Sequence, residues 1–401
     1  ENAAGEYGGA IYILNPARAY VRDVVFSKNS AASSGGAVYA IGATAEFNYV
    51  TFTENVAEGT NGGAVFMGKD IDEKKDENGT TVSVDVPAQV TMNKVTATAN
   101  SAGNNGGVLY SGKAILKAYN STFNQNTANA GSAFYFYSGA EGGIYNSVIE
   151  ANACKETNTG NAGAIALATS SSKITVHSST LKNNSSSGLG GGILVTGPSL
   201  LDLYNITATG NSAAKGGFMY ETAAYTVVDI AGLTVSGNTA SIGGPVIWGN
   251  TKNAVLNIDK SKYKDNENDI AQEGYWDSAV VNLLTVNDVS KNIAAAEKYV
   301  SKQQPEKPAT TKKPVSVEDV FSLAKKSRDA DINSNYNKLK RLDNSRNFMS
   351  RSTKDYKNIN GKTVTVDTFV YPTKGKTDNG IVGLGILLYQ SLLYKKAHPK
   401  D

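Results

Sequence analysis

The chain has very little of what builds disulfide frameworks, multi-histidine metal sites or membrane spans. Its 401 residues include one cysteine, Cys154, and two histidines, His177 and His398. A single cysteine excludes an internal disulfide framework, and two histidines exclude a metal centre built from several imidazoles. The longest nearly apolar run, residues 381–394, is shorter than the ~20 residues that usually span a bilayer. The fold must therefore rest on an apolar core.

Charge is distributed unevenly along the chain. Residues 291–401 hold 22 Lys and Arg against 11 Asp and Glu, which leaves 17 against 25 for residues 1–290. The net charge of +3 thus hides an acidic first part and a basic tail. A basic surface favours anionic partners. The tail has no zinc or RNA-binding motif and no regularly interleaved aromatics, so we expect no nucleic acid partner.

A paired motif recurs through the first two-thirds of the chain. Glycine pairs open short apolar runs at Gly8-Gly9, Gly35-Gly36, Gly62-Gly63, Gly106-Gly107, Gly191-Gly192, Gly216-Gly217 and Gly243-Gly244. An apolar-x-x-Asn element ends at Asn29, Asn55, Asn100, Asn126, Asn152, Asn184, Asn211, Asn238 and Asn266. The asparagines are 26, 45, 26, 26, 32, 27, 27 and 28 residues apart. A period near 27 with two insertions is typical of a solenoid.

The residues around each asparagine alternate between apolar and polar. Positions three, eight and ten before it are mostly apolar, and position nine is mostly polar, which indicates two strands with one buried face. A third strand follows the glycines, and we predict that its inward column is Ile11, Val38, Val65, Leu109, Phe134, Ile165, Leu194, Met219 and Val246. Each coil is therefore predicted to hold three strands.

These patterns predict an all-β fold, a right-handed single-stranded parallel β-helix of about nine coils over residues 1–290. Asn2 lies six residues before Gly8, as Asn29 lies six before Gly35, so we expect upstream coils. Residues 291–315 are rich in Pro, Thr and Lys and indicate a linker. Residues 316–401 are expected to form a small basic α+β module, with a helix from Ser316 and a strand over residues 363–371. Residues 381–394 are either a buried element of that module or a short membrane anchor.

The motifs resemble a known repeat. Gly8-Gly9-Ala10-Ile11 and Gly35-Gly36-Ala37-Val38 are similar to the GGA[ILV] motif of the polymorphic outer membrane protein (Pmp) repeat. Phe26-Ser27-Lys28-Asn29 and Phe52-Thr53-Glu54-Asn55 are similar to its FxxN motif. The resemblance covers about residues 1–290 and implies a pectin lyase-like parallel β-helix, display on the cell surface and adhesion. Nothing after residue 290 resembles the membrane barrel that ends the autotransporters of that family.

The asparagine column suits stacked coils, because an amide can donate to and accept from its copy in the next coil. Glycine supplies turn conformations with positive φ. We therefore favour an architectural role for both over a binding role. We expect Cys154 to be a loop thiol and His177 a surface residue. No cofactor and no metal site is expected.

Two outward-facing patterns are candidate sites. The residue after the inward column is aromatic in its first five copies, Tyr12, Tyr39, Phe66, Tyr110 and Tyr135. Such a stripe either binds sugar rings or a protein partner, or it merely covers the sheet with strand-favouring residues. The largest insertion, residues 68–87, is predicted to be a charged loop, and insertions in solenoids often mark the binding face.

Asp202 and Asp229 form the second pattern, a carboxylate ladder on adjacent coils in the polar column. We expect a separation of about 5 Å, within the range of a retaining glycosidase pair. The nearest basic residue of that column, Lys117, is three coils away. We favour a solvated polar face as the explanation of the pair, and we do not predict an enzyme.

The sequence thus predicts an extracellular, cell-surface adhesin-like or structural protein. Its partners would be glycans or proteins of a host or neighbouring cell, and its basic tail would contact an anionic wall polymer or a membrane surface. One alternative is a carbohydrate-active lyase or hydrolase on the same fold. Another is a passive spacer or filament subunit.

Overall fold

The computed structural model describes residues 1–155, 163–169, 171–249, 254–258, 262–263, 280–283, 350–357 and 363–370. The chain divides into two compact units, Glu1–Glu306 and Lys307–Asp401, and each is described by itself. Within its described residues, the first unit consists of strands and the turns between them. The predicted boundaries near residues 290 and 315 lie outside the described residues.

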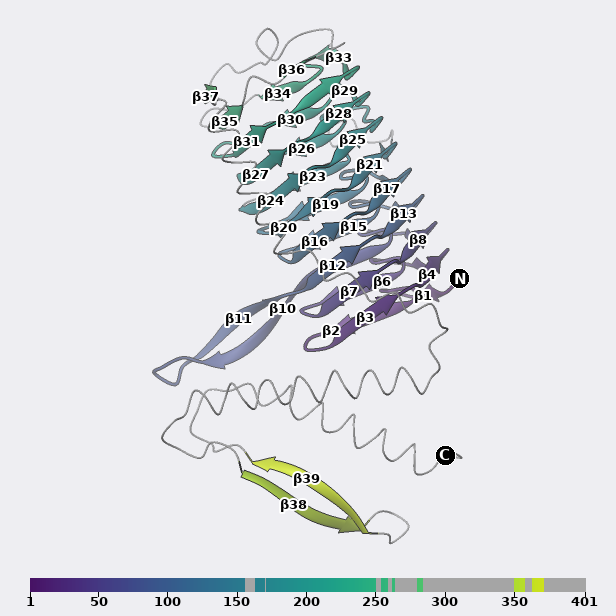
Figure 1. The fold of residues 1–401 in the computed structure, drawn as a ribbon, viewed down its shortest axis with the longest axis vertical. Coiled ribbons are helices and arrows are strands. Elements are labelled where there is room, and N and C mark those ends of the chain that lie inside the picture. Colours follow the sequence, from purple (N-terminus) through teal and green to yellow (C-terminus); the bar gives the residue numbers. More distant parts are fainter. Residues whose placement is uncertain are drawn as a thin grey trace. The chain divides into compact units, whose positions relative to one another are not determined.

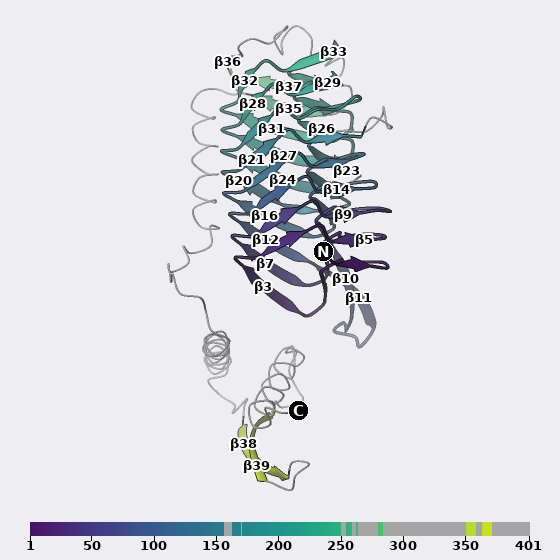
Figure 2. The same ribbon diagram turned by 90° about the vertical axis from the view of Figure 1, so that its right-hand side faces the viewer.

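The first unit is an all-β parallel solenoid of about nine turns. Its strands stack in parallel along one axis (Figure 1). Most turns pass through four sheets, which we number I to IV in chain order after the glycines (Figure 2). The predicted parallel β-helix is confirmed at this level. The prediction of three strands per coil was wrong, because a two-residue strand also follows the asparagine in most turns.

Sheets I and II are the longest. Sheet I contains β2 (Ile11–Leu14), β6 (Val38–Ile41), β10 (Val65–Lys75), β15 (Leu109–Gly112), β19 (Phe134–Tyr137), β23 (Ile165–Ala168), β26 (Ile193–Val195), β30 (Met219–Glu221) and β34 (Ile247–Gly249). Sheet II contains β3 (Arg18–Arg22), β7 (Thr44–Asn48), β12 (Gln89–Asn93), β16 (Ile115–Tyr119), β20 (Glu141–Tyr145), β24 (Ser172–His177), β27 (Ser199–Tyr204), β31 (Val227–Ala231), β35 (Val255–Ile258) and β37 (Val280–Leu283).

Sheets III and IV flank the asparagine of each turn. Sheet III contains β4 (Val25–Ser27), β8 (Thr51–Thr53), β13 (Thr96–Thr98), β17 (Thr122–Asn124), β21 (Val148–Glu150), β25 (Thr180–Lys182), β28 (Thr207–Thr209), β32 (Thr234–Ser236) and β36 (Lys262–Tyr263). Sheet IV contains β1 (Ala3–Ala4), β5 (Ser30–Ala31), β9 (Val56–Ala57), β14 (Ser101–Ala102), β18 (Thr127–Ala128) and β22 (Ala153–Cys154). Two further strands, β29 (Ser212–Lys215) and β33 (Thr239–Gly243), pair with each other.

Equivalent residues lie over one another from turn to turn. Val38 pairs with Ile11 below and Val65 above, and Phe52 pairs with Phe26. The inward side chains of all these turns form one continuous core that reaches from Ile13 to Leu256. Alternation with period two therefore places one apolar face of every strand in a shared interior, as the sequence predicted.

The predicted register was wrong by one residue in two turns. Ile193, and not Leu194, pairs with inward Ile165, and Ile247 pairs with inward Met219. The positive φ of +59° that opens the first of these turns lies at Gly190, so the glycine pair there is Gly190-Gly191. Three consecutive glycines in the sequence do not reveal which of them occupies this position.

The largest insertion is an antiparallel hairpin and not a loop. β10 runs on beyond sheet I and pairs with β11 (Thr81–Pro87), from Lys69 opposite Pro87 to Lys75 opposite Thr81. The hairpin projects from the solenoid (Figure 1).

The described part of the second unit is a separate antiparallel hairpin of β38 (Ser350–Lys357) and β39 (Thr363–Val370). Strand β39 covers residues 363–370 of the stretch 363–371 for which a strand was predicted. The predicted helix from Ser316 and the apolar run 381–394 lie outside the described residues. In the described part of the chain, no helix has the length and apolarity to cross a membrane.

Candidate binding face

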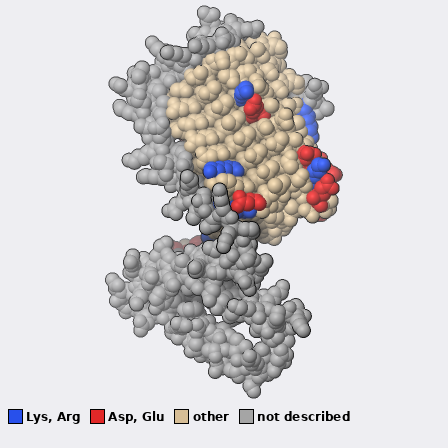
Figure 3. Space-filling model, turned by 45° about the vertical axis from the view of Figure 1, so that its right-hand side comes forward, with Lys and Arg blue, Asp and Glu red and all other residues tan. Residues whose placement is uncertain are grey.

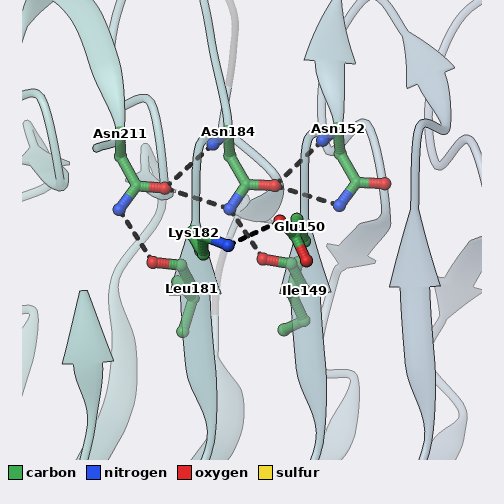
Figure 4. A network of polar contacts seen from close by, with 7 residues as sticks. All are labelled: Ile149, Glu150, Asn152, Leu181, Lys182, Asn184 and Asn211. Atoms are coloured by element: carbon green, nitrogen blue, oxygen red, sulfur yellow. Dashed lines mark hydrogen bonds and ion pairs between the residues drawn. The ribbon is translucent and has the colours of Figure 1, made fainter. Parts of the chain in front are cut away.

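The stacked asparagines form a hydrogen-bonded ladder between sheets III and IV. At each step from Asn29 to Asn238, one Oδ1 accepts from the backbone N and from the Nδ2 of the asparagine in the preceding turn. Asn152 donates both bonds to Asn184, at 3.1 and 3.0 Å (Figure 4). Asn184 Nδ2 also donates to the carbonyl of Ile149 at 2.9 Å. The ladder joins Asn2, Asn29, Asn55, Asn100, Asn126, Asn152, Asn184, Asn211 and Asn238.

The ladder closes a strained turn. The residue before each ladder asparagine from Asn29 to Asn238 has a φ between 53° and 64°, and most of these residues are not glycine. Side-chain-bearing residues in this conformation persist only where their surroundings enforce it. From Asn29 to Asn238 the asparagines are almost fully buried and their amides are used within the stack, so they hold the coil together. The ninth predicted position, Asn266, lies outside the described residues.

The structure brings the five predicted aromatic residues into one row on the outer face of sheet I. The register pairs Tyr12 with Tyr39, Tyr39 with Phe66, Phe66 with Tyr110, and Tyr110 with Tyr135. Their ring centroids are 5.2, 4.7, 5.0 and 5.5 Å apart, with interplanar angles of 8–11°. We call these five residues the aromatic row. Tyr7 lies beside its first two rings, 4.6 Å from Tyr39.

The stacking of the rings determines which ring surfaces of the aromatic row face solvent. Because adjacent rings are nearly parallel, each inner ring has its two faces turned toward its neighbours. A Cβ added at Gly68 or Gly112 would come within 3.3 or 3.2 Å of the rings of Phe66 and Tyr110, so these glycines leave the space the rings occupy. The row therefore presents ring edges and hydroxyl groups to solvent along most of its length, and a free ring face only at its Tyr12 end.

Tyr39, Tyr110 and Tyr135 of the aromatic row stay neutral at physiological pH, because the pKa of each is raised. Burial raises the pKa of Tyr39 to about 12, with the neighbouring Tyr7 and Tyr12 adding to the effect. Burial also raises the pKa of Tyr110 and of Tyr135. Their hydroxyls can therefore both donate and accept hydrogen bonds. Tyr12 is 51% exposed, and Leu14 and Tyr137 on the same face are 46% and 39% exposed.

Farther along the axis, the next three residues of the same column are buried. Ala166, Leu194 and Tyr220 follow Tyr135 in register and are 2–5% exposed. They pack together with Leu189 and Trp248. Leu194 and Trp248 were not predicted at these positions because of the register error. Buried residues thus interrupt the stripe after its first five turns.

The hairpin continues the strand that carries Phe66 and is fixed at its base. Asp85 of β11 pairs with Lys69 and with Lys113 of the neighbouring turn. Hydrogen bonds from Lys113 first, and then from Lys69, hold the pKa of Asp85 below its usual range. Asn15 Nδ2 donates to Asp72 Oδ1 at 2.9 Å, which ties β10 to the first turn. The hairpin is therefore a charged arm beside the aromatic row.

The two carboxylates Asp202 and Asp229 are adjacent in register on sheet II, and Lys117 lies three positions away in the same column. Thr175 Oγ1 donates to Asp202 Oδ2 at 3.2 Å. Burial first, and then the charge of Asp229, raises the pKa of Asp202, while Lys173 of a neighbouring column opposes the shift. The two carboxylates are placed as a general acid and a second carboxylate would be. However, no basic side chain lies next to them in their column.

Two predictions of exposure were wrong. His177 is 2% exposed, because its register neighbours on either side are the bulky Tyr145 and Tyr204. Cys154 is in β22 and not in a loop, and it occupies the column of small buried residues that includes Ala128. Among the described residues, no group of three or more His, Cys, Asp and Glu side chains is arranged to hold a metal ion.

Sequence reasoning missed one buried acid. Glu221 of β30 is 2% exposed and stands in the inward column between Val195 and Gly249. Its Oε1 accepts from the backbone N of Ala223 at 2.6 Å, and its Oε2 has no hydrogen-bond partner. Burial raises the pKa of Glu221 to about 7. The sequence contained the information needed to predict this. Glu221 is two residues after inward Met219, and residues two apart in a strand point to the same side.

Comparison with known proteins gives a match to a family model. Residues 23–41 match the family model of the Chlamydia polymorphic membrane protein (Chlamydia_PMP) repeat. This stretch contains the FxxN motif at Asn29, strand β5 and the glycine pair Gly35-Gly36, so it spans the turn around one rung of the asparagine ladder. No curated protein and no solved structure gives a significant match. The repeat match and the parallel solenoid together fit a Pmp-like β-helix.

Proposed function

We propose that this chain is a non-enzymatic, adhesin-like β-helix protein of the cell surface, which binds a protein on a host or neighbouring cell. The matched repeat is that of a membrane protein family, which supports surface exposure. The observation that carries the proposal is the aromatic row on sheet I. Partly exposed tyrosines in a rigid, pre-ordered array are typical of protein-binding surfaces, because they supply contact area at little entropic cost.

The geometry of the row favours a protein over a sugar as its partner. A sugar ring that stacks on tyrosine needs a free ring face, and the inner faces of the row are turned toward neighbouring rings. Ring edges with neutral hydroxyls suit a surface that offers apolar side chains and hydrogen-bond acceptors. The hairpin adds a charged rim beside this apolar row, as in many interfaces with an apolar centre and a polar border.

The basic tail supports a second contact, with an anionic wall polymer or a membrane surface, that would keep the solenoid at the cell surface. Residues 291–401 supply its charge. This part of the proposal rests on composition alone, since the side chains of the tail lie outside the described residues.

The test is binding of the purified protein to candidate target cells. Replacing Tyr39 and Tyr110 with alanine together removes two rings of the row, and binding should fall about tenfold or more, the change produced by ~1.4 kcal/mol. Tyr20 and Tyr225, 66% and 72% exposed and outside the row, provide the matched control Tyr20→Ala with Tyr225→Ala. If the Tyr39 and Tyr110 variant binds as well as the control, the row only covers the sheet, and the passive spacer is the better assignment.

A further inference from the structure

Sheet III carries two in-register columns of small hydroxyl-bearing residues on its outer face. The first column is Val25, Thr51, Thr96, Thr122, Val148, Thr180, Thr207 and Thr234. The second column is Ser27, Thr53, Thr98, Asn124, Glu150, Lys182, Thr209 and Ser236. Six of eight positions in the first column are threonine. We call these two columns the threonine face.

The threonine face carries almost no net charge. From Val25 to Thr234 its first column has no ionisable side chain, and the next position of that column, in β36, is Lys262. The two ionisable side chains of the second column, Glu150 and Lys182, form an ion pair with each other at 3.0 Å. Figure 3 brings forward the right-hand side of Figure 1, where β8, β13, β17 and β21 are labelled, and charged side chains on it are few. The outer face of sheet II differs, because Glu46, Lys117 and Asp202 lie in one of its columns.

The threonine face is also regular and pre-ordered. Parallel strands lie about 4.8 Å apart, so hydroxyl groups repeat along the axis at that interval. Threonine is β-branched and has few rotamers, so little side-chain entropy is lost when its hydroxyl binds a partner. Most of these threonines are partly exposed, and Thr98 Oγ1 donates to Asn124 Oδ1 at 2.6 Å, which shows that neighbouring turns bring their polar groups together.

We propose that the threonine face binds an uncharged, extended polysaccharide whose chain lies along the stacking axis. One sugar unit of an extended β-linked chain is about 5 Å long, close to the strand spacing of roughly 4.8 Å, so successive units can meet successive turns. Each unit offers hydroxyls to the threonine hydroxyls and an apolar ring face to the threonine methyls. An uncharged polymer fits a face without net charge, whereas an anionic one gains nothing from it.

Strand propensity alone does not explain this surface. Propensity favours Val, Ile, Tyr and Phe as well as Thr on an exposed strand face, and sheet I uses such larger residues at equivalent outward positions. Sheet III instead repeats threonine in six turns. The proposal is independent of the aromatic row, which lies on another sheet.

The experiment is retention of the full chain on insoluble β-1,4-glucan and on chitin, with polygalacturonate as the anionic comparator. Replacing Thr96 and Thr122 with lysine puts two adjacent cations on the face, and retention on the uncharged polymer should fall about tenfold or more, the change that ~1.4 kcal/mol produces. The matched control places the same two charges on sheet II, through Thr44→Lys and Thr91→Lys, and should be retained like the wild type. Circular dichroism melting shows whether each variant is folded.

A second variant guards against misfolding. Thr51→Val, Thr96→Val and Thr122→Val together keep the branched shape and strand propensity but remove three hydroxyls, so the fold should survive while retention falls. The proposal is overturned if the wild type is retained on neither uncharged polymer, or if the valine variant is retained equally well. Loss of cell binding in the Tyr39 and Tyr110 variant, with retention unchanged, would leave both proposals standing as separate sites.

Discussion

The turns before Asn152 and those after Gly163 share one backbone plan but differ in what fills and covers it. In the earlier turns the inward column of sheet III includes Phe26, Phe52 and Phe123, whereas Leu181, Ala208 and Val235 take these places later. On the outer face of sheet I, the earlier turns carry the aromatic row, whereas Ala166, Leu194 and Tyr220 of the later turns are buried in the same column. The asparagine ladder is the same in both.

This difference separates what the coil requires from what it tolerates. Every described turn keeps a ladder asparagine, because a strained turn and buried polar groups permit no substitute. The interior accepts any combination of side chains with the right total volume. The outer faces are free of both constraints, so differences between turns are largest there and are the best guide to function.

The largest expected effect is a cavity in an aromatic turn. Phe123 is fully buried and packs edge-on against Phe134, with centroids 4.6 Å apart. Phe123→Ala should cost about 3–5 kcal/mol of the free energy of unfolding. Val235→Ala, the matched change in a later turn, should cost about 1.5 kcal/mol, from two methyl-sized groups at ~0.8 kcal/mol each. Urea unfolding measures both, and equal losses would show that the two regions are not packed differently.

Breaking the ladder should affect both regions alike. Asn126 Oδ1 accepts from the N and Nδ2 of Asn100, and its Nδ2 donates to Ala97 O and Asn152 Oδ1. Asn126→Ala leaves these buried groups without partners and should cost about 3 kcal/mol. Asn211→Ala should cost about the same, and Asn78→Ala, at the exposed hairpin tip, nearly nothing. A much smaller loss at Asn211 would mean that the ladder stabilises only the aromatic turns.

The sequence predicted the solenoid because its constraints repeat. Period-two alternation and the asparagine spacing recur in many copies, so one irregular turn did not hide the pattern. The register failed in two turns, and in one of them the local signal was degenerate, at the three glycines that begin with Gly190. The fourth strand was missed because two residues, such as Ser30 and Ala31, are too few to show a period.

The candidate sites were predictable only in position. Alternation placed Tyr39 and Tyr110 on the outside, but spacing along a chain carries no information on ring orientation, and it is the stacking that disfavours sugar binding there. The threonine face was in the sequence too, but threonine on a strand is so common that it draws no attention. Its regularity becomes informative once Thr96, Thr122 and their equivalents are known to share one flat sheet.

Glu221 is a further difference between the two regions. In its inward column of sheet I, the later turns contain a buried acid where the earlier turns contain apolar or neutral residues. Its pKa is raised from 4.5 to about 7, so the folded chain keeps its proton while the unfolded chain loses it. Stability should be highest below pH 4.5 and fall as the pH rises to about 7, by roughly 3 kcal/mol at 1.36 kcal/mol per pKa unit.

Glu221→Gln should remove this dependence. At pH 8 the variant should be more stable than the wild type by roughly that amount, and at pH 4 the two should be equal. Thermal melts from pH 4 to 8 check this, with Glu77→Gln at the exposed hairpin tip as the control. A wild-type advantage at pH 8 would show that the ionised carboxylate is stabilised by contacts that burial alone does not reveal.

The smallest effect is expected at the carboxylate pair on sheet II. Burial and the charge of Asp229 raise the pKa of Asp202, so Asp202→Asn should stabilise the fold at pH 7 by less than about 1 kcal/mol, and the gain should disappear below pH 4. The same variant decides whether the later turns differ in chemistry as well as packing. If the wild type cleaves an acidic polysaccharide and Asp202→Asn does not, the pair is catalytic and the adhesin-like assignment fails. If neither protein cleaves it and the variant is the more stable, Asp202 is a polar residue that the coil tolerates on its outer face.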